Sequence, residues 1–170
     1  MPEGVPRNKR EPTARRGTVE AGSGEEPAVP VTSFAGIREQ FDSYIGDIVY
    51  ATMTTVDRRG RPRARVLIPV WEVPAPDAGP IGWLATFHTP VKDAHLAHNP
   101  HTTFSYWSPK QNQVAVDTVA AWTDDPATRR HVWDLYRRTS PRGAGYDLGQ
   151  FWRDPDDPQL AILRLVPWRI

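Results

Sequence analysis

The sequence predicts a mainly β protein, a β-barrel with small helices packed outside it. Six segments are rich in the β-branched and aromatic residues that strands prefer. Two pairs of these segments are joined by short turns, as in hairpins. Few helices separate them, whereas a parallel α/β sheet needs a helix after nearly every strand. Antiparallel strands in this number are typical of a closed or partly closed barrel.

The first predicted elements are a helix and a hairpin. Apolar residues recur at helical spacing over residues 33–44, with Ser33 as the N-cap and Gly46-Asp47 as the stop. Residues 48–56 then read as a strand and residues 63–73 as the strand that returns. The turn between them contains Gly60, which supplies a permissive backbone position. The hairpin therefore brings the basic residues that follow Gly60 alongside the first strand.

The remaining elements follow the same logic. A buried strand at 81–85 leads into a short helix at 90–98, where Thr89 is the N-cap and Pro90 takes the first helical position. Residues 101–107 and 113–123 form a second strand pair. A helix then starts at Asp124-Asp125, where acids suit the helix dipole. A helical turn at 146–152 and a long strand over 159–170 complete the chain.

The composition predicts a single domain preceded by a tail. Residues 1–32 carry almost no large apolar side chains, and their five basic residues are matched by five acidic ones. Such a segment cannot bury enough surface to offset its ordering entropy, so we expect it to be disordered. Residues 33–170 are long enough to form one domain with a sizeable core. The seven tryptophans of the chain suit core packing, with a ligand pocket or subunit interface as the alternative.

Charge and cysteine content exclude several classes of function. The net charge of +1 gives no general case for nucleic-acid or membrane binding, and no window is long and apolar enough for a bilayer. With no cysteine, disulfides, thiol catalysis and thiolate metal sites are excluded. His95 and His98 lie one turn apart on the predicted helix, but no nearby carboxylate completes a ligand set, so no metal site is predicted. A cytoplasmic protein is expected.

The residues around the predicted 90–98 helix are the first candidate site. Lys92 falls in the first turn, where the helix dipole disfavours a cation unless an anion lies beside it. With the hydroxyls of Thr86 and Thr89 and the free helix N–H groups, Lys92 would make a phosphate cradle. The alternative is a strand–loop–helix with a solvated lysine.

Two further polar residues lie in predicted strands. Arg65 stands beside Val66, Leu67 and Ile68, where an arginine is costly unless it faces solvent or an anion. It alternates with two other arginines, so a solvated basic strand face is one interpretation. A shared anion with Lys92 is the other. Gln113 heads an apolar strand and by itself indicates only a turn.

In order and spacing, these motifs resemble the pyridoxamine 5′-phosphate oxidase-like family, the flavin-binding split barrels. The resemblance covers residues 48–125. It rests on P-x-x-R-V-L-I at residues 62–68, on T-x5-K-x3-L-x2-N-P at residues 86–100, and on Gln113-Val114-x-Val116. The closing residues Pro167-Trp168-Arg169-Ile170 also resemble the usual end of the family's last strand.

The resemblance implies a split β-barrel of the FMN-binding type that forms a homodimer, with the cofactor at the subunit interface. It implies that Arg65, Val66, Leu67 and Ile68 run beside the flavin. It places Thr86 and Lys92 at the phosphate, with Thr89 supplying a hydroxyl where the oxidase has a serine. Gln113 would contact the flavin ring from the other subunit.

The implied activity is that of an FMN-dependent oxidoreductase acting on an unidentified small molecule, with no catalytic acid or base assigned. Pro90 and Val91 stand where the oxidase has a serine and an arginine, and the oxidase's substrate-reading C-terminal segment is absent. Vitamin B6 synthesis is therefore not predicted. Two alternatives remain open: a deazaflavin-dependent reductase, favoured by the arginines at 61 and 63, and a non-catalytic flavin- or haem-binding protein.

Overall fold

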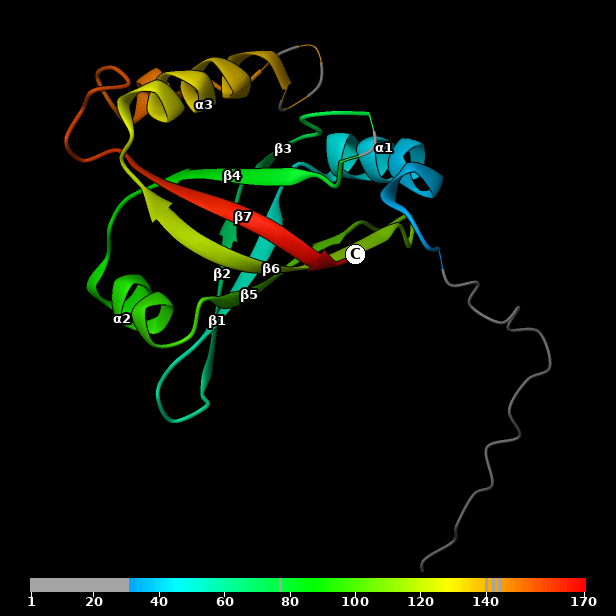
Figure 1. The fold of residues 1–170 in the computed structure, drawn as a ribbon, viewed down its shortest axis with the longest axis horizontal. Coiled ribbons are helices and arrows are strands. Elements are labelled where there is room, and N and C mark those ends of the chain that lie inside the picture. The colour runs from blue at the N-terminus through cyan, green and yellow to red at the C-terminus, as the bar shows by residue number, and fades with distance from the viewer. Residues whose placement is uncertain (1–30, 77, 140, 142, 144) are drawn as a thin grey trace, which may run out of the picture. The chain divides into compact units, whose positions relative to one another are not determined.

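The computed structural model describes residues 31–76, 78–139, 141, 143 and 145–170. Its strands form one antiparallel sheet in the order β2-β1-β5-β6-β7-β4-β3, which curls into a half-barrel (Figure 1). The strands are β1 Ala51–Val56, β2 Pro62–Leu67, β3 Val70–Glu72, β4 Ile81–Thr86, β5 His101–Trp107, β6 Gln113–Thr123 and β7 Ala161–Arg169. The helices are η1 Phe34–Gly36, α1 Arg38–Ile48, α2 Pro90–His98, α3 Pro126–Thr139 and η2 Leu148–Gln150. The predicted β-barrel class is confirmed as its partly closed form.

The hairpin of β1 and β2 forms as predicted. Its turn closes where Asp57 accepts hydrogen bonds from the backbone N–H groups of Arg59 and Arg61, at 2.8 and 2.9 Å. Gly60 adopts φ +75°, a conformation that a side chain would strain. The register sets Met53 opposite Arg65 and Ala51 opposite Leu67. Because cross-strand partners share a face, Arg65 lies on the side of the buried residues of β1.

The prediction of a single strand over residues 63–73 is wrong. The chain leaves β2 after Leu67 and enters β3 at Val70, and these two strands lie at opposite edges of the sheet. Pro69 has no N–H to donate to a strand ladder. The carbonyl of Ile68 instead accepts a 2.5 Å hydrogen bond from the Tyr136 hydroxyl on α3. This break carries the chain from one edge of the half-barrel to the other.

The first helix also differs from its prediction. A 3-10 turn precedes it, and Ser33 makes no side-chain capping bond. α1 then continues through Gly46-Asp47 to Ile48, and Val49 follows as the C-cap with φ 64°. The helix extends beyond its predicted end because its apolar face packs on the core: Phe41 is buried there, with Ile45 and Ile48 beside it.

Two apolar clusters fill the molecule. The first lies between α1 and the sheet, where Trp71 donates a 2.8 Å hydrogen bond from its indole N–H to the Tyr106 hydroxyl. The second lies under α3 and joins Val132, Leu135 and Tyr136 to buried residues of β4 and β7. Both clusters pack against the sheet, so the strands hold the two helices in place.

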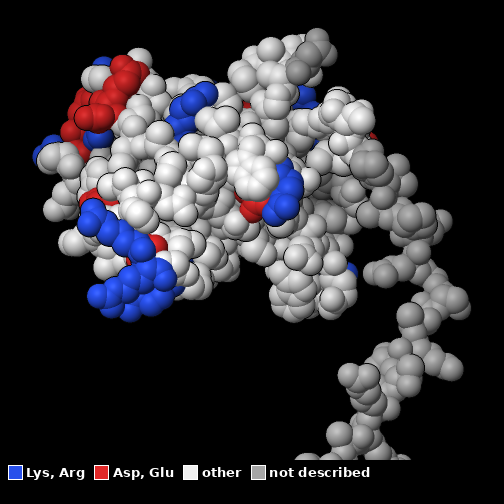
Figure 2. Space-filling view, turned by 60° about the horizontal axis from the view of Figure 1, so that its bottom comes forward, with Lys and Arg blue, Asp and Glu red and all other residues white. Residues whose placement is uncertain are grey.

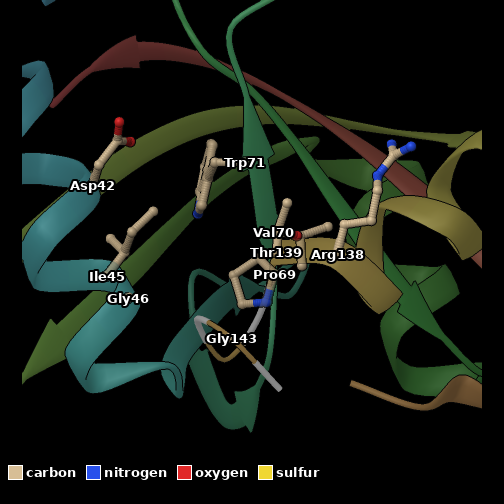
Figure 3. Close-up of a pocket in the computed structure, with 9 residues that line it drawn as sticks. All are labelled: Asp42, Ile45, Gly46, Pro69, Val70, Trp71, Arg138, Thr139 and Gly143. Atoms are coloured by element: carbon tan, nitrogen blue, oxygen red, sulfur yellow. The ribbon is translucent and has the colours of Figure 1, made fainter. Parts of the chain in front are cut away.

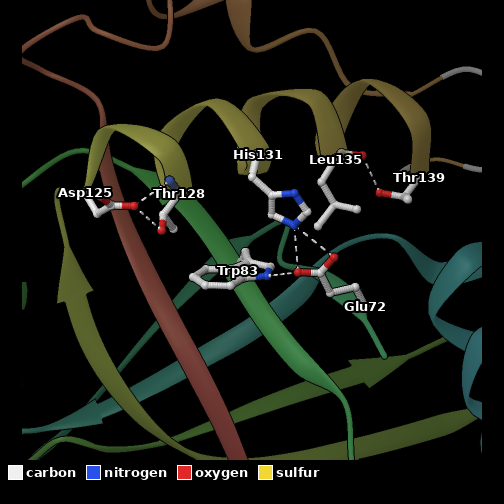
Figure 4. Close-up of polar contacts among 7 residues, drawn as sticks. All are labelled: Glu72, Trp83, Asp125, Thr128, His131, Leu135 and Thr139. Atoms are coloured by element: carbon white, nitrogen blue, oxygen red, sulfur yellow. Dashed lines mark hydrogen bonds and ion pairs between the residues drawn. The ribbon is translucent and has the colours of Figure 1, made fainter. Parts of the chain in front are cut away.

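Polar contacts also attach α3 to the sheet. The Glu72 carboxylate on β3 accepts hydrogen bonds from Trp83 Nε1 at 2.7 Å and from His131 Nε2 at 2.8 Å (Figure 4). At the start of the same helix, Asp125 accepts from the backbone N–H and the hydroxyl of Thr128. The predicted helix start at the acidic pair is thereby confirmed.

The predicted N-terminal tail falls almost entirely in residues 1–30, outside the described residues. Among the residues that the structure describes, no helix is long and apolar enough to cross a membrane.

Candidate functional site

Lys92 is buried at the start of α2, with only 3% of its surface exposed. Its Nζ donates hydrogen bonds to Thr86 Oγ1 at 2.6 Å and to the Phe87 carbonyl at 2.8 Å. The ammonium also lies 5.8 Å from the ring centroid of Trp122, within range of a cation–π contact. An ammonium has three N–H donors, so one remains for a ligand. Thr86 and Lys92, both predicted to lie at the phosphate, are therefore in direct contact.

Arg65 reaches the same end of the half-barrel from β2. Its Nη1 donates a 2.9 Å hydrogen bond to Thr55 Oγ1 on β1. Its Nη2 is buried and has no hydrogen-bond partner among the described residues. A buried donor without an acceptor costs about 1–3 kcal/mol, and more when the group is charged. The Nη2 atom is therefore suited to an acceptor that comes from outside the chain.

Thr55 links Arg65 to α2. Its Oγ1 lies 2.9 Å from His95 Nδ1, and both side chains are buried. His95 follows Lys92 by three residues on the same helix, so their side chains lie on adjacent positions of one face. The two cationic side chains are thus held by neighbouring contacts on β1, β4 and α2.

The electrostatics of this site favour an anion. Burial, together with the positive charge of Arg65, lowers the pKa of Lys92 to about 8. Burial also lowers the pKa of Arg65, and Arg63 adds to the effect. Among the described residues, neither cation forms an ion pair with a carboxylate. The nearest acid to Lys92 in sequence, Asp93, is instead bonded to His88 at 2.9 Å.

A pocket of about 280 Å³ opens beside Thr86. One wall is the end of the arginine strand, Val66, Leu67 and Ile68, and Phe87 lies on the other side. The described lining residues carry no charged side chain; the others are Tyr50, Ala85, Thr86, Tyr136, Tyr146, Leu148, Phe151 and Trp152. Val66 is 65% exposed although it is a large apolar residue. This pocket fits a flat apolar ring, and Thr86 connects it to Lys92.

Thr89 and Gln113, also predicted as site residues, are placed differently. Thr89 precedes α2 in extended conformation and is exposed, and its side chain makes no capping bond. Gln113 is exposed at the opposite end of β6 from Trp122, in a pocket with Gln40 and Tyr44 of α1. Within one chain, Gln113 therefore does not meet Lys92.

Two other hollows contain none of the predicted site residues. One, of about 320 Å³, lies between α1 and α3 and is lined by Asp42, Trp71 and Arg138 among others (Figure 3). The other, of about 540 Å³, is lined by arginines of the β1–β2 turn and by the start of α2. Basic side chains gather at one end of the face shown in Figure 2.

Sequence reasoning missed Thr55 as a site residue and considered His95 only as a metal ligand. The strand alternation that buries Met53 also buries Thr55. Arg65 lies opposite Met53, so Thr55 is its diagonal neighbour across the hairpin. The hairpin register could therefore have indicated that Thr55 lies beside Arg65. Nothing in the sequence indicates that His95 contacts β1. Among the described residues, no group of three or more potential ligands is arranged to hold a metal ion.

The chain has the fold of the pyridoxamine 5′-phosphate oxidase-like, FMN-binding split barrels. A Clostridium acetobutylicum protein related to general stress protein 26 of B. subtilis, of the pyridoxinephosphate oxidase family, superposes with a TM-score of 0.60 at 12% identity, covering 78% of this chain and 84% of that one. A pyridoxamine 5′-phosphate oxidase-related, FMN-binding protein from Nostoc punctiforme gives 0.56 at 16% identity, over 82% and 83%.

An F420 reductase also superposes, with a TM-score of 0.50 at 19% identity over 83% of this chain and 97% of that one. No protein-family model matches the sequence. A comparison with curated proteins gives no match.

Proposed function

We propose that the protein is an FMN-dependent oxidoreductase that transfers hydride to or from a small molecule. The observation that carries this proposal is a pair of cations at one end of the half-barrel, the buried Lys92 and the half-buried Arg65, whose buried Nη2 has no partner among the described residues. The positive charge of Arg65 opposes that of the buried Lys92, and an anion that contacts both relieves this repulsion. A phosphate dianion satisfies both, and the flavin-binding structural neighbour supports FMN as its source.

Different residues of the chain would bind the phosphate and the ring system of the cofactor. Lys92 and Arg65 hold the phosphate by charge-assisted hydrogen bonds, and Thr86 orients the ammonium of Lys92. The apolar pocket along Val66, Leu67 and Ile68 orients the ring system and excludes water from it. When bound, the flavin supplies the hydride chemistry.

A homodimer completes this proposal, with Gln113 of one subunit beside the flavin of the other. The outer face of β6 and β7 supports it, because it exposes large apolar side chains to solvent. Val119 lies opposite Val166 in the strand pairing, and Trp168 is 57% exposed beside them. Apolar side chains gathered on one sheet face are typical of an interface. Light scattering at micromolar concentration tests this: a dimer is expected, and a monomer contradicts it.

Deazaflavin is the second candidate cofactor. The arginines of the β1–β2 turn, Arg58, Arg59 and Arg61, line a pocket with the start of α2. Against these three arginines the pocket has one acid, Asp57, so its described lining is positive on balance and suits a cofactor with an acidic tail. The structural similarity to an F420 reductase supports the same alternative.

Absorption spectroscopy and titration distinguish these proposals. Purified protein that shows flavin bands, or that takes up added FMN with micromolar or tighter affinity, supports the FMN assignment. Tighter binding of the deazaflavin in a parallel titration supports the second candidate. A Soret band identifies a haem protein and overturns both.

A further inference from the structure

The hydroxyl of Thr55 lies between two other polar side chains, the half-buried Arg65 and the buried His95. The positions of its hydrogen bonds follow from the chemistry of these groups. A guanidinium only donates, so Arg65 Nη1 must donate to Thr55 Oγ1. The single hydroxyl hydrogen of Thr55 then needs an acceptor. His95 Nδ1, 2.9 Å away, is the only other hydrogen-bond partner of that oxygen among the described residues.

These hydrogen-bond requirements favour one tautomer of His95, that is, one ring nitrogen as the carrier of the hydrogen. If Nδ1 carried a hydrogen, it would have to donate to Thr55, and the fully buried Thr55 hydroxyl hydrogen would have no acceptor. Leaving a buried donor unsatisfied is costly. The favoured arrangement therefore has the imidazole hydrogen on Nε2, with Nδ1 accepting from Thr55.

We propose that His95 and Thr55 are positioning residues for the anion site. His95 fixes the Thr55 hydroxyl, and that hydroxyl holds Nη1 of Arg65, which leaves Nη2 directed to the phosphate of the ligand. This proposal rests on the proposed flavin function and extends it to two residues that touch no ligand. The contacts of Thr55 also connect α2, which contains Lys92, to β2, which contains Arg65. The two cations that would bind one anion are therefore held in a fixed relative position.

The fixed geometry matters because a guanidinium recognises phosphate through its planar fork. An arginine held by one of its two terminal nitrogens loses less freedom when the other binds a ligand. Without Thr55, the side chain of Arg65 would have to be ordered by the anion itself. Removing the Thr55 hydroxyl should therefore weaken the binding of the ligand's phosphate and leave the binding of its ring system unchanged.

The test compares FMN with riboflavin, which has the same ring system but no phosphate. In the protein of residues 1–170, Thr55→Val should weaken FMN binding roughly tenfold and leave riboflavin within about twofold. Thr55→Ser, which keeps the hydroxyl, should stay close to the wild type. Thr102→Val is the matched control: Thr102 is also buried in a strand and bonded to another hydroxyl, that of Thr118 at 2.6 Å, but it lies outside the chain of contacts.

His95 is tested by removal and rescue. His95→Leu should reduce the preference for FMN over riboflavin, and His95→Asn, whose amide oxygen can accept from Thr55, should restore it. Equal weakening of both ligands by Thr55→Val would reduce Thr55 to a purely structural role and overturn the proposal. If the wild type prefers FMN and Thr55→Val keeps that preference, the proposal alone fails. If the wild type shows no preference, the phosphate site itself fails.

A second measurement does not depend on flavin. The ring-nitrogen NMR shifts of His95 in the ligand-free protein report which nitrogen carries the hydrogen. The hydrogen is expected on Nε2, and Thr55→Val should change the Nδ1 shift. A hydrogen found on Nδ1 would contradict the arrangement.

Discussion

The ammonium of Lys92 and the hydroxyl of Thr86 are joined by a 2.6 Å hydrogen bond across the junction of β4 and α2. This contact explains how a lysine is tolerated in the first turn of a helix, where the dipole opposes it. Thr86 and the Phe87 carbonyl accept two of its three donors, and burial holds the side chain in one position. The ammonium of Lys92 is therefore already desolvated before a ligand binds.

Replacing Lys92 should impair FMN binding directly. Lys92→Met keeps most of the side-chain volume and removes the charge, so a loss of about 1.5–3 kcal/mol is expected, a rise in Kd of roughly 10- to 150-fold. Fluorescence titration with FMN measures it. Lys110→Ala, at an exposed lysine of the β5–β6 turn, should leave the affinity unchanged. An unchanged Kd in Lys92→Met would remove Lys92 from the phosphate site.

The affinity for FMN should depend on pH in the range where Lys92 loses its proton. Its pKa is about 8 in the free protein, and a bound phosphate dianion raises that pKa because it stabilises the ammonium. Below about pH 8 the ammonium is already present and the affinity is nearly constant. Above about pH 8 binding must take up a proton, so Kd should rise by up to about tenfold per pH unit.

Titrations from about pH 7 to about pH 9.5 test this dependence. Riboflavin serves as the control, since it lacks the phosphate and its affinity should not follow Lys92. An FMN affinity that stays flat across the range would show that Lys92 does not face the phosphate.

Tyr136 should be important for stability. Its hydroxyl donates to the Ile68 carbonyl at the break between β2 and β3, and it accepts from the Ala85 N–H at 3.0 Å. Tyr136→Phe leaves both backbone groups without this partner in a buried region, so a loss of about 1–3 kcal/mol in the free energy of unfolding is expected. Urea denaturation measures it. Tyr44→Phe on α1 is a control, because the Tyr44 hydroxyl bonds only to the exposed Gln40 among the described residues.

Glu72 should stabilise the attachment of α3 to the sheet. Glu72→Leu removes the acceptor of Trp83 Nε1, a largely buried donor, and of His131 (Figure 4). We expect a loss of about 1–2 kcal/mol in the free energy of unfolding. Arg130→Ala on the same helix breaks only an exposed 3.5 Å ion pair with Asp156 and should cost less than about 0.5 kcal/mol. Equal losses in the two variants would refute the role assigned to Glu72.

The strands and the α2 helix could be predicted from sequence because local signals decide them: β-branched runs, Gly60 in the turn, and Thr89-Pro90 before the helix. The break at Ile68-Pro69 could not, because the Tyr136 hydroxyl that stabilises it lies far along the chain. The extension of α1 past Gly46-Asp47 likewise depends on tertiary packing.

The candidate site was predictable in part. Lys92 and Arg65 are conspicuous in sequence because each is a cation in an unfavourable local setting, and the structure brings both to one end of the half-barrel. The contact between Thr55 and His95 joins residues 40 positions apart, so it depends on how α2 packs on β1. Gln113 meets neither cation within one chain, and its predicted role depends on a partner subunit.

A crystal structure of the protein with FMN would test the central claim most directly. The account predicts phosphate oxygens within hydrogen-bond distance of Lys92 Nζ and Arg65 Nη2, with the ring along Val66, Leu67 and Ile68. A phosphate bound elsewhere, with Arg65 Nη2 still lacking an acceptor, would contradict it.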